Sequence, residues 1–239
     1  MTSALRALPA LVPALAAVHA GPALTARGPL LRVLPRLAGR GRPGGVALTF
    51  DDGPHPVGTP LVLAELDRLG WRATFFMLGS QARRHPEVAR SVVLAGHEVA
   101  VHGDEHRNHL GRSWRWVEAD LARACGDLRA ITGVQPRWFR PPYGVLSAGS
   151  VRAARSLGLD PVLWTAWGKD WLAPIPGQVA AELRRGLTDG CTVLLHDSDC
   201  TSREGSYRST AAALPLLAAE LRWRGLEVRA LADHGVGRR

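Results

Sequence analysis

Lysine is almost missing from this chain of 239 residues, in which Lys169 is the only one, so arginine supplies nearly all of the positive charge. Three cysteines are too few for a framework of disulfides. No stretch approaches the roughly 20 unbroken apolar residues of a membrane-spanning helix. Charged residues make up 21% and hydrophobic residues 46% of the chain, which is ordinary globular usage and argues against intrinsic disorder. A chain of this length can bury a sizeable core.

The net charge of +9 is concentrated near the amino terminus. Residues 1–44 hold six arginines and no acid, so they carry +6, and the other 195 residues (239 − 44) carry +3 (9 − 6). Such a segment either binds a polyanion or reflects a coding preference for arginine. Because no recognisable nucleic-acid-binding motif follows it, we expect no nucleic-acid partner.

Residues 1–20 resemble a secretory signal peptide. One arginine precedes an apolar stretch from Leu8 to Val18, and Val18-His19-Ala20 fits the small-x-small pattern of a cleavage site. Two prolines interrupt the apolar stretch, so the alternative is an apolar helix or strand that packs against the domain. A signal peptide would place the protein outside the cell or in the cell envelope, and the alternative location is the cytoplasm. Any membrane association would run through residues 1–20.

Strands and helices alternate along the rest of the chain, after an Arg-, Gly- and Pro-rich stretch over residues 27–45 that indicates a linker. The expected strands cover residues 46–50, 73–77, 97–101, 138–139, 161–164, 192–195 and 226–231. The expected helices cover residues 59–69, 86–95, 113–132, 147–157, 178–187 and 210–224. About seven alternations predict a parallel α/β fold, open or closed as a barrel. We expect a basic segment over residues 1–44 and one domain over residues 45–235.

Polar residues that could take part in catalysis or metal binding follow the expected strands, at the point where each strand ends. They are Asp51 and Asp52, His102, Arg140, Asp170 and His196. In parallel α/β folds the active site forms at the carboxyl ends of the strands, where such side chains meet on one face. The sequence therefore predicts one polar site built from five strand ends.

Part of this set has the spacing of a metal site. His102 and His106 are four residues apart, so on one helical turn both imidazoles would point the same way. Two histidines and one carboxylate would leave an open position for water on a zinc ion or a similar cation. Of the adjacent acids Asp51 and Asp52, one can bind the metal while the other takes a proton. The alternatives are a pair of loop histidines and, for Asp-Asp-Gly-Pro, an ordinary turn that ends a strand.

The ordered set of motifs resembles a known family. The motifs are Thr49-Phe50-Asp51-Asp52-Gly53-Pro54, His102-x-x-x-His106, Phe139-Arg140-Pro141-Pro142-Tyr143-Gly144, Asp170-Trp171 and Val193-Leu194-Leu195-His196-Asp197. Together they are similar to the five motifs of the polysaccharide deacetylases, the NodB-homology group of carbohydrate esterase family 4. The resemblance covers residues 45–235 and implies a distorted (β/α) barrel, commonly with seven parallel strands. It also implies metal-dependent removal of acetyl groups from an N-acetylated sugar, in chitin-like oligomers or peptidoglycan.

The resemblance implies a role for each matching residue. Asp51 resembles the catalytic base, Arg140 the arginine that orients it, and the backbone N–H of Tyr143 the oxyanion donor. His196 resembles the general acid, and Asp170 the carboxylate that holds it. The implied metal ligands are Asp52, His102 and His106, and the implied substrate-binding residues are Trp171, Leu194 and Pro141. The expected cofactor is a divalent metal, zinc first, with cobalt, nickel and manganese as alternatives. The expected partner is an N-acetylated carbohydrate, and the expected state is a monomer.

The sequence departs from the family pattern at two motifs. Gly103 follows the first metal histidine where the family usually has Ser or Thr, and Asp104 and Glu105 are expected to add negative charge near the metal. Trp167 stands where many members have an acid. With its neighbours Trp164 and Trp171 it could stack on sugar rings or belong to the core, and we expect at least one of the three to face the groove.

Several alternatives stay open at this stage. The same scaffold could hydrolyse another amide or an O-acetyl ester, or it could bind carbohydrate without catalysis. Arg140 could serve a structural salt bridge, and His196 could be a satisfied core histidine. Among the cysteines, Cys125 is expected in the core. Cys191 and Cys200 are expected to remain unbonded, because a strand separates them.

Overall fold

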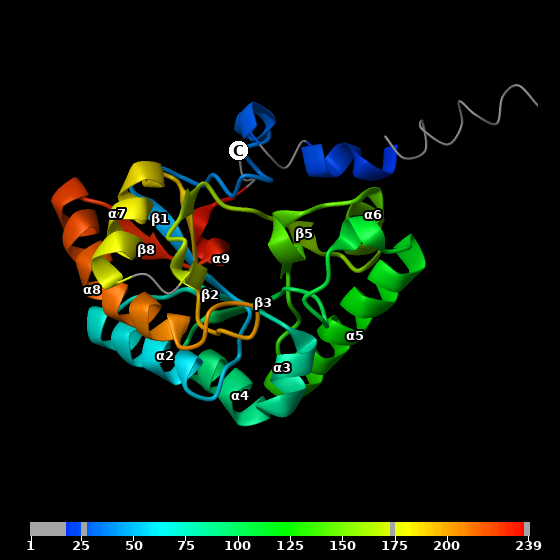
Figure 1. The fold of residues 1–239 in the computed structure, drawn as a ribbon, viewed down its shortest axis with the longest axis horizontal. Coiled ribbons are helices and arrows are strands. Elements are labelled where there is room, and N and C mark those ends of the chain that lie inside the picture. Colours follow the sequence, from blue (N-terminus) through cyan, green and yellow to red (C-terminus); the bar gives the residue numbers. More distant parts are fainter. Residues whose placement is uncertain (1–17, 25–27, 173–174, 237–239) are drawn as a thin grey trace, which may run out of the picture.

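A curled parallel sheet forms the centre of the molecule in a computed structural model that describes residues 18–24, 28–172 and 175–236 (Figure 1). The strands are β1 (Gly45–Asp51), β2 (Thr74–Met77), β3 (Glu98–Val101), β4 (Trp138–Phe139), β5 (Asp160–Pro161), β6 (Ala166–Trp167), β7 (Thr192–His196) and β8 (Glu227–Arg229). Seven of them run in the order β5-β4-β3-β2-β1-β7-β6, and the short β8 pairs with the first half of β1. All the described pairings are parallel.

This order confirms the distorted barrel of seven parallel strands. β5 and β6 are consecutive in the chain but stand at opposite ends of the strand order, so the curled sheet stays open between them. β8 and β2 share one side of β1, since Gly45 pairs with Glu227 while Thr49 pairs with Thr74.

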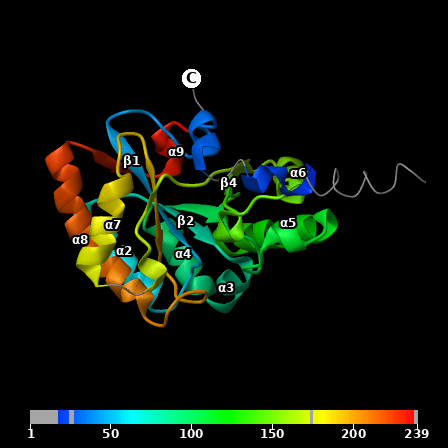
Figure 2. The same cartoon turned by 45° about the horizontal axis from the view of Figure 1, so that its top comes forward.

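Helices cover the outer face of the curled sheet (Figure 2). They are α2 (Gly58–Leu69), α3 (Gly79–Arg84), α4 (Pro86–Leu94), α5 (Trp114–Thr132), α6 (Ala148–Ser156), α7 (Pro176–Gly186) and α8 (Ser206–Arg224). The short α9 (Leu231–His234) instead places Leu231 in the cluster inside the barrel. The six helices expected from the sequence are confirmed, although α8 begins four residues earlier than expected. The short helices α3 and α9 were not predicted, because a segment of one or two turns has too few positions to show a helical period.

Side chains alternate between two buried clusters along β1, all seven residues of which are buried. Val46, Leu48 and Phe50 pack with the helices in the larger cluster. Ala47 faces the inside of the barrel, in a smaller cluster with Phe76, Ala100, Trp138, Val162, Leu231 and Val236. The same alternation turns Thr49 and Asp51 inward, because successive residues of a strand point to opposite faces.

The expected strand over residues 161–164 is wrong beyond Pro161. The backbone that follows β5 makes other hydrogen bonds: Leu163 N–H donates to the Leu37 carbonyl at 2.7 Å. The carbonyls of Val162 and Leu163 accept hydrogen bonds from the Arg140 side chain at 3.3 and 3.0 Å. The Val162 N–H still donates to Phe139 of β4 at 2.9 Å, but Arg140 and Leu37 take the groups that follow, and strand pairing resumes only at β6.

The linker interpretation is wrong for residues 37–42, which pack against the domain. Ala38 is buried, and Gly39 accepts a hydrogen bond from Thr192 Oγ1 at 2.6 Å through its carbonyl. Gly41 and Arg42 donate backbone hydrogen bonds to Gly190 at 3.0 Å and to His234 at 2.8 Å. Residues 37–42 are the middle of a longer segment, the amino-terminal arm (residues 31–43), which lies at the amino ends of β1 and β7.

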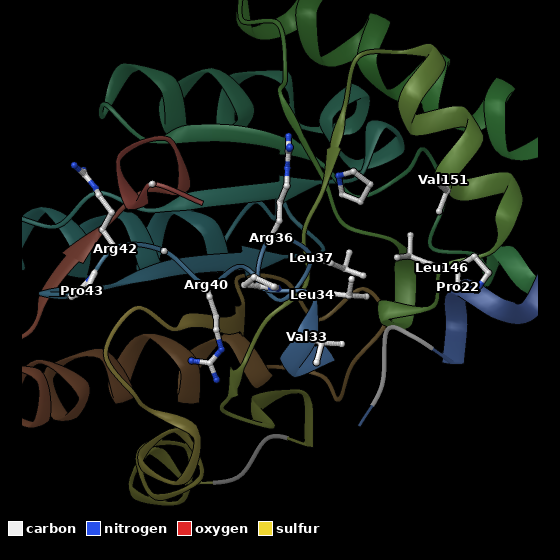
Figure 3. A pocket seen from close by; sticks show the side chains of 14 residues that line it. Pro22, Val33, Leu34, Arg36, Leu37, Arg40, Arg42, Pro43, Leu146 and Val151 are labelled. Carbon is white, nitrogen blue, oxygen red and sulfur yellow. The ribbon is translucent and has the colours of Figure 1, made fainter. Parts of the chain in front are cut away.

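The arm also borders a largely apolar cavity of about 870 Å³. Figure 3 shows Val33, Leu34 and Leu37 of the arm on one side of it, with Leu146 and Val151 on the other. The labelled arginines of the arm point in different directions rather than into one common site.

Residues 1–17 lie outside the described residues, so most of the expected signal peptide does too. Residues 18–24 are helical, and the His19 ring lies 3.2 Å from the Leu110 carbonyl oxygen. Among the helices in the described part of the chain, none is both long and apolar enough to cross a membrane. All three cysteines are free, which confirms that Cys191 and Cys200 are unbonded, and Cys125 is buried as expected.

Candidate active site

A cleft of about 370 Å³ opens at the carboxyl ends of the strands and collects most of the predicted site residues. Its lining residues are Asp51, Asp52, His102, His106, Tyr143, Gly144, Trp164, Trp167, Trp171, Leu194, His196, Thr201 and Ser202. Arg140 and Asp170 are fully buried directly behind this lining. The predicted Pro141 is also buried but is not among the lining residues.

Three of these residues form a candidate metal site. The Nε2 atoms of His102 and His106 lie 3.3 and 3.5 Å from Oδ1 of Asp52. One ligand atom from each residue falls within 4.8 Å of the others. Asp52 reaches this position just past the end of β1, where its backbone takes a positive φ of 77°.

The surroundings of the three side chains fit a divalent cation. Asp52 Oδ1 is buried and has no hydrogen-bond partner, while Oδ2 accepts a hydrogen bond from Thr201. His102 Nδ1 lies 2.9 Å from the Arg140 carbonyl, so Nδ1 holds the proton and the Nε2 lone pair faces the cleft. A buried carboxylate oxygen that accepts no hydrogen bond and a neighbouring imidazole nitrogen with a free lone pair are ligands that zinc prefers.

The electrostatics of the site also favour a cation. Burial alone would raise the pKa of Asp52, but the facing imidazoles of His102, His196 and His106 hold it well below its ordinary value. Burial opposes protonation of His102, but the carboxylates of Asp51 and Asp52 raise its pKa overall. Burial lowers the pKa of His106 to about 4, so its ring is neutral near pH 7. The metal site therefore presents an ionised carboxylate, Asp52, beside the neutral ring of His106.

Asp51 is held from behind by Arg140. Arg140 Nη1 donates to Asp51 Oδ1 at 2.6 Å and to Thr49 Oγ1 at 2.8 Å. The guanidinium is fully buried and lies 4.0 Å from the centre of the Phe76 ring. With its hydrogen bonds to the Val162 and Leu163 carbonyls, it is fixed on every side. The ion pair is thus structural and, because Asp51 lines the cleft, it also orients a carboxylate towards the site.

His196 ends β7, beside Asp51 of the neighbouring strand β1, and is held by Asp170. Its Nδ1 lies 2.9 Å from Asp170 Oδ1, and its backbone N–H donates to Asp170 Oδ2 at 2.7 Å. Thr210 of α8 donates to the same Oδ2 at 2.7 Å. Burial would lower the pKa of His196, but the negative charge of Asp170, with Asp52 and Asp51 beyond it, raises it to about 9. A protonated histidine at the cleft differs from a satisfied core histidine, because it can donate a proton there.

An aromatic wall closes one side of the cleft. The rings of Trp164 and Trp167 meet edge to face at 5.9 Å, and those of Trp167 and Trp171 stack at 6.2 Å. All three line the cleft together with Leu194, which confirms that at least one tryptophan faces the groove. Tyr143 stands opposite with its ring 4.4 Å from that of His106 and a backbone φ of 60°.

The expected negative charge of Asp104 and Glu105 near the metal site needs correction. Asp104 is bound by Arg83 at 2.6 Å and by Arg123 at 2.7 Å, so its carboxylate faces α3 and α5. Glu105 pairs with Arg107 at 3.2 Å on the surface. Both charges are therefore compensated away from the cleft.

Three further residues support the site and were not predicted: Thr201, Thr210 and Asp120. Thr201 and Thr210 lie in a loop and a helix after β7, and nothing in their spacing distinguishes them from other threonines. Asp120 did leave a signal, because it interrupts the buried face of α5 between Val117 and Leu121. A carboxylate at such a position requires hydrogen-bond donors nearby.

Comparisons with known proteins agree on one set of relatives. Residues 38–162 match a family model described as polysaccharide deacetylase. A chitooligosaccharide deacetylase of Sinorhizobium fredii is 36% identical over 210 residues, which are 85% of this chain and 97% of that protein. A peptidoglycan-N-acetylglucosamine deacetylase of Listeria monocytogenes is 33% identical over 182 residues, 76% of this chain and 37% of that protein.

Solved structures give the same result. A family 4 carbohydrate esterase from Streptomyces lividans, in complex with acetate, is 29% identical with a TM-score of 0.70, covering 80% of this chain and 95% of that one. A CE4 family pseudoenzyme from Bacillus anthracis is 26% identical with a TM-score of 0.74, covering 82% of this chain and 67% of that one. Since both kinds of protein share the fold, the side chains of the cleft must decide whether this chain is active.

Proposed function

The chain belongs to the polysaccharide deacetylase family, whose members hydrolyse carbon–nitrogen bonds other than peptide bonds, and from this premise we propose that it removes N-acetyl groups from N-acetylglucosamine units. The observation that supports this most is the joint presence of two charged dyads and a metal triad around one cleft. Asp51, paired with Arg140, and His196, paired with Asp170, stand side by side at the ends of the neighbouring strands β1 and β7. Binding sugar alone would not call for a protonated histidine beside a carboxylate at the cleft.

The cofactor we propose is a divalent cation, zinc first, with cobalt, nickel and manganese as alternatives. Asp52, His102 and His106 would hold it, and when bound it would polarise the acyl oxygen and lower the pKa of a water molecule. Thr201 fixes the second oxygen of Asp52, and the Arg140 carbonyl fixes the tautomer of His102. These contacts orient the ligands before the cation binds.

The chain's own residues would perform the proton transfers. As water attacks the amide carbon, a C–O bond forms and Asp51 accepts the proton that the water releases. The backbone N–H of Tyr143 would stabilise the oxyanion of the tetrahedral intermediate. As the C–N bond breaks, His196 donates its Nε2 proton to the leaving amine nitrogen. Its raised pKa keeps that proton in place at neutral pH.

The substrate we propose is an N-acetylated carbohydrate, either a chitin-like oligomer or peptidoglycan. Relatives named for both substrates support this range. Leu194 and the tryptophan wall offer apolar contacts for the acetyl methyl and for the faces of sugar rings. We further propose a monomer that acts outside the cell or in its envelope, without a nucleic-acid partner.

Acetate release from N-acetylglucosamine oligomers tests the proposal. The purified protein is first treated with a chelator and then supplied with Zn²⁺ or Co²⁺, with Asp51→Asn alongside. We expect release that requires the cation and that Asp51→Asn abolishes. Asp67→Asn, at an exposed position of α2, serves as the charge-matched control and should retain full activity.

The alternatives give different results in the same assay. Release from O-acetylated sugars or other amides, without release from the oligomers, would mean a different acyl substrate. Tight oligosaccharide binding with no release from any of these substrates, after the cation has been added, would indicate a binding protein.

A further inference from the structure

The backbone between the two metal-site histidines is held by a buried carboxylate of α5. Asp120 is fully buried, and its two oxygens accept the backbone N–H groups of Asp104 at 2.9 Å and Glu105 at 3.3 Å. The cationic neighbour Arg123 is directed to Asp104 instead. A carboxylate without a cation, in a fully buried place, is costly unless its hydrogen bonds fix something the fold needs.

Gly103 shows that the loop and this carboxylate fit closely together. Its φ of +104° is a conformation that side-chain-bearing residues rarely adopt. A Cβ atom on Gly103 would lie 3.0 Å from Asp120 Oδ2 and 3.2 Å from the Glu105 carbonyl oxygen. The space that a Ser or Thr side chain would take at this position is therefore bordered by Asp120. The departure at Gly103 and the buried acid of α5 are two parts of one arrangement.

The two histidines depend on this loop to different degrees. His102 directly follows β3, and its Nδ1 has an acceptor of its own in the Arg140 carbonyl. His106 lies on the far side of the loop, and its buried Nδ1 has no hydrogen-bond partner among the described residues. Its ring contacts those of Tyr143 and His102, and its Nε2 lies 3.5 Å from Asp52 Oδ1. The backbone that precedes His106 is therefore what directs its ring towards the other two ligands.

Other contacts hold the same loop at its outer edge. Gly79 and Ser80, at the start of α3, donate backbone hydrogen bonds to the carbonyls of Gly103 at 3.0 Å and Asp104 at 3.1 Å. Arg83 and Arg123 bind the Asp104 side chain. At its inner edge the loop is held by Asp120, which accepts the N–H groups of Asp104 and Glu105, the two residues before His106.

We propose that Asp120 is a positioning residue, which places His106 by fixing the backbone N–H groups of Asp104 and Glu105 and so sets the affinity of the site for a divalent cation. The inference rests on the proposed function only in assuming that the triad binds such a cation. Second-shell residues of this kind commonly contribute about 10- to 100-fold to metal affinity.

The test measures the Kd for Zn²⁺ of the chelator-stripped protein by competition with a chromogenic chelator. Asp120→Asn keeps the shape of the side chain but turns an NH₂ group towards one of the two N–H donors. We expect its Kd for Zn²⁺ to rise about 10- to 100-fold. Glu118→Gln, which removes a charge from the same helix on the side facing Ser156, should leave the Kd unchanged.

Hydrogen exchange provides a second readout that needs no variant to be active. In the metal-free wild-type protein, the amides of Asp104 and Glu105 should exchange as slowly as those of α5, and in Asp120→Asn they should exchange faster. If Asp120→Asn does not fold, Gly103→Ala tests the same contact from the other side and should also weaken Zn²⁺ binding. An unchanged Kd in a folded variant whose melting temperature falls would overturn the inference, because Asp120 would then serve stability alone.

The outcomes separate this inference from the proposed function. Wild-type protein that binds Zn²⁺ more tightly than Asp120→Asn, yet releases no acetate, would support the role of Asp120 and refute deacetylation. Acetate release by the wild type, together with equal Zn²⁺ affinity in the wild type and Asp120→Asn, would support deacetylation and refute the role of Asp120.

Discussion

Asp170 holds His196 by two bonds at once: one carboxylate oxygen faces the ring Nδ1 at 2.9 Å, and the other accepts the backbone N–H of the same residue at 2.7 Å. The backbone bond fixes the carboxylate relative to β7, so the ring bond has little freedom in direction. With Nδ1 engaged by Asp170, Nε2 is the nitrogen left for the proposed proton transfer at the cleft, and the carboxylate charge favours the protonated ring.

The pH dependence of activity should follow this dyad. The pKa of His196 is raised to about 9, so the protonated acid is present at neutral pH and is lost as the pH rises through that value. Asp170→Asn removes the main cause of the increase, so the alkaline limb of kcat should move to lower pH. In the wild type, protonated His196 also stabilises the folded state. This stabilisation is complete below the ordinary histidine pKa of 6.5 and is lost as the pH rises through about 9. A kcat profile with an unmoved alkaline limb in Asp170→Asn would contradict this assignment.

Replacing Arg140 by lysine should impair activity while keeping the charge. Lysine cannot reproduce a planar set of bonds to Asp51, Thr49 and two carbonyls, so Asp51 would lose its fixed direction. We expect kcat/KM for acetate release to fall about 100-fold, as misplacement by about 1 Å commonly causes. Arg137→Lys changes an exposed pair with Asp160 and should retain activity within about twofold, since such pairs contribute about 0–1 kcal/mol.

Truncating Trp171 should weaken substrate binding more than it slows the reaction. The ring stacks on Trp167, lines the cleft and is 38% exposed, so it can cover a sugar face. Loss of one aromatic contact of about 0.5–1.5 kcal/mol predicts that Trp171→Ala raises KM about 2- to 10-fold. Trp223→Ala removes a tryptophan that is 82% exposed on α8, outside the cleft, and should change nothing. Equal KM values in Trp171→Ala and wild type would place the sugar elsewhere.

A glycine pair should separate crowding from backbone strain in unfolding experiments. Gly39 and Gly133 have φ values of 71° and 74°, but a Cβ on Gly39 would lie 2.6 Å from Thr192 Oγ1, whereas one on Gly133 would meet nothing within 4 Å. Gly133→Ala should lower the free energy of unfolding by about 1–2 kcal/mol, the usual cost of left-handed backbone. Gly39→Ala should lose at least about 1 kcal/mol more, through overpacking. If urea denaturation gives the same decrease in the free energy of unfolding for both variants, the arm moves aside for the added methyl group without a cost in stability.

Cation binding should stabilise the folded protein measurably. At a Zn²⁺ concentration about 1,000 times the Kd, a ligand that binds only the folded state adds about 4 kcal/mol. The melting temperature should therefore fall on chelation and recover with Zn²⁺. His106→Ala should lose most of this response, while His85→Ala, outside the cleft, should keep it. If Zn²⁺ does not change the melting temperature of the wild type, the three residues Asp52, His102 and His106 do not form a metal site.

Residues next to strand ends could be predicted from the sequence, and the structure brings them together. Asp51, Asp52, His102 and His196 follow apolar runs, so the parallel fold fixes their face before any contact is known. Thr201 and Thr210 could not be found in this way. Their positions depend on the path of a loop and on the packing of α8, which have no period in the sequence.

Backbone hydrogen bonds explain the other errors. Residues 162–163 have the composition of a strand, but the Leu163 N–H pairs with Leu37 and both carbonyls accept hydrogen bonds from Arg140. Gly39 and Gly41 have the composition of a linker, but glycine is also what a close backbone approach requires. Composition indicates which backbone conformations a segment can adopt. Its hydrogen-bond partners in the folded protein decide which of them it does adopt.

The amino-terminal arm is connected to Asp51, the proposed base, by a short chain of hydrogen bonds. Leu37 accepts the backbone N–H of Leu163, the Leu163 carbonyl accepts an Arg140 N–H, and Arg140 holds Asp51. A polypeptide started at Gly45 would retain every catalytic side chain and still lose the first of these hydrogen bonds. We therefore expect the proposed activity to need the arm as well as the strands, because the arm helps to orient Asp51.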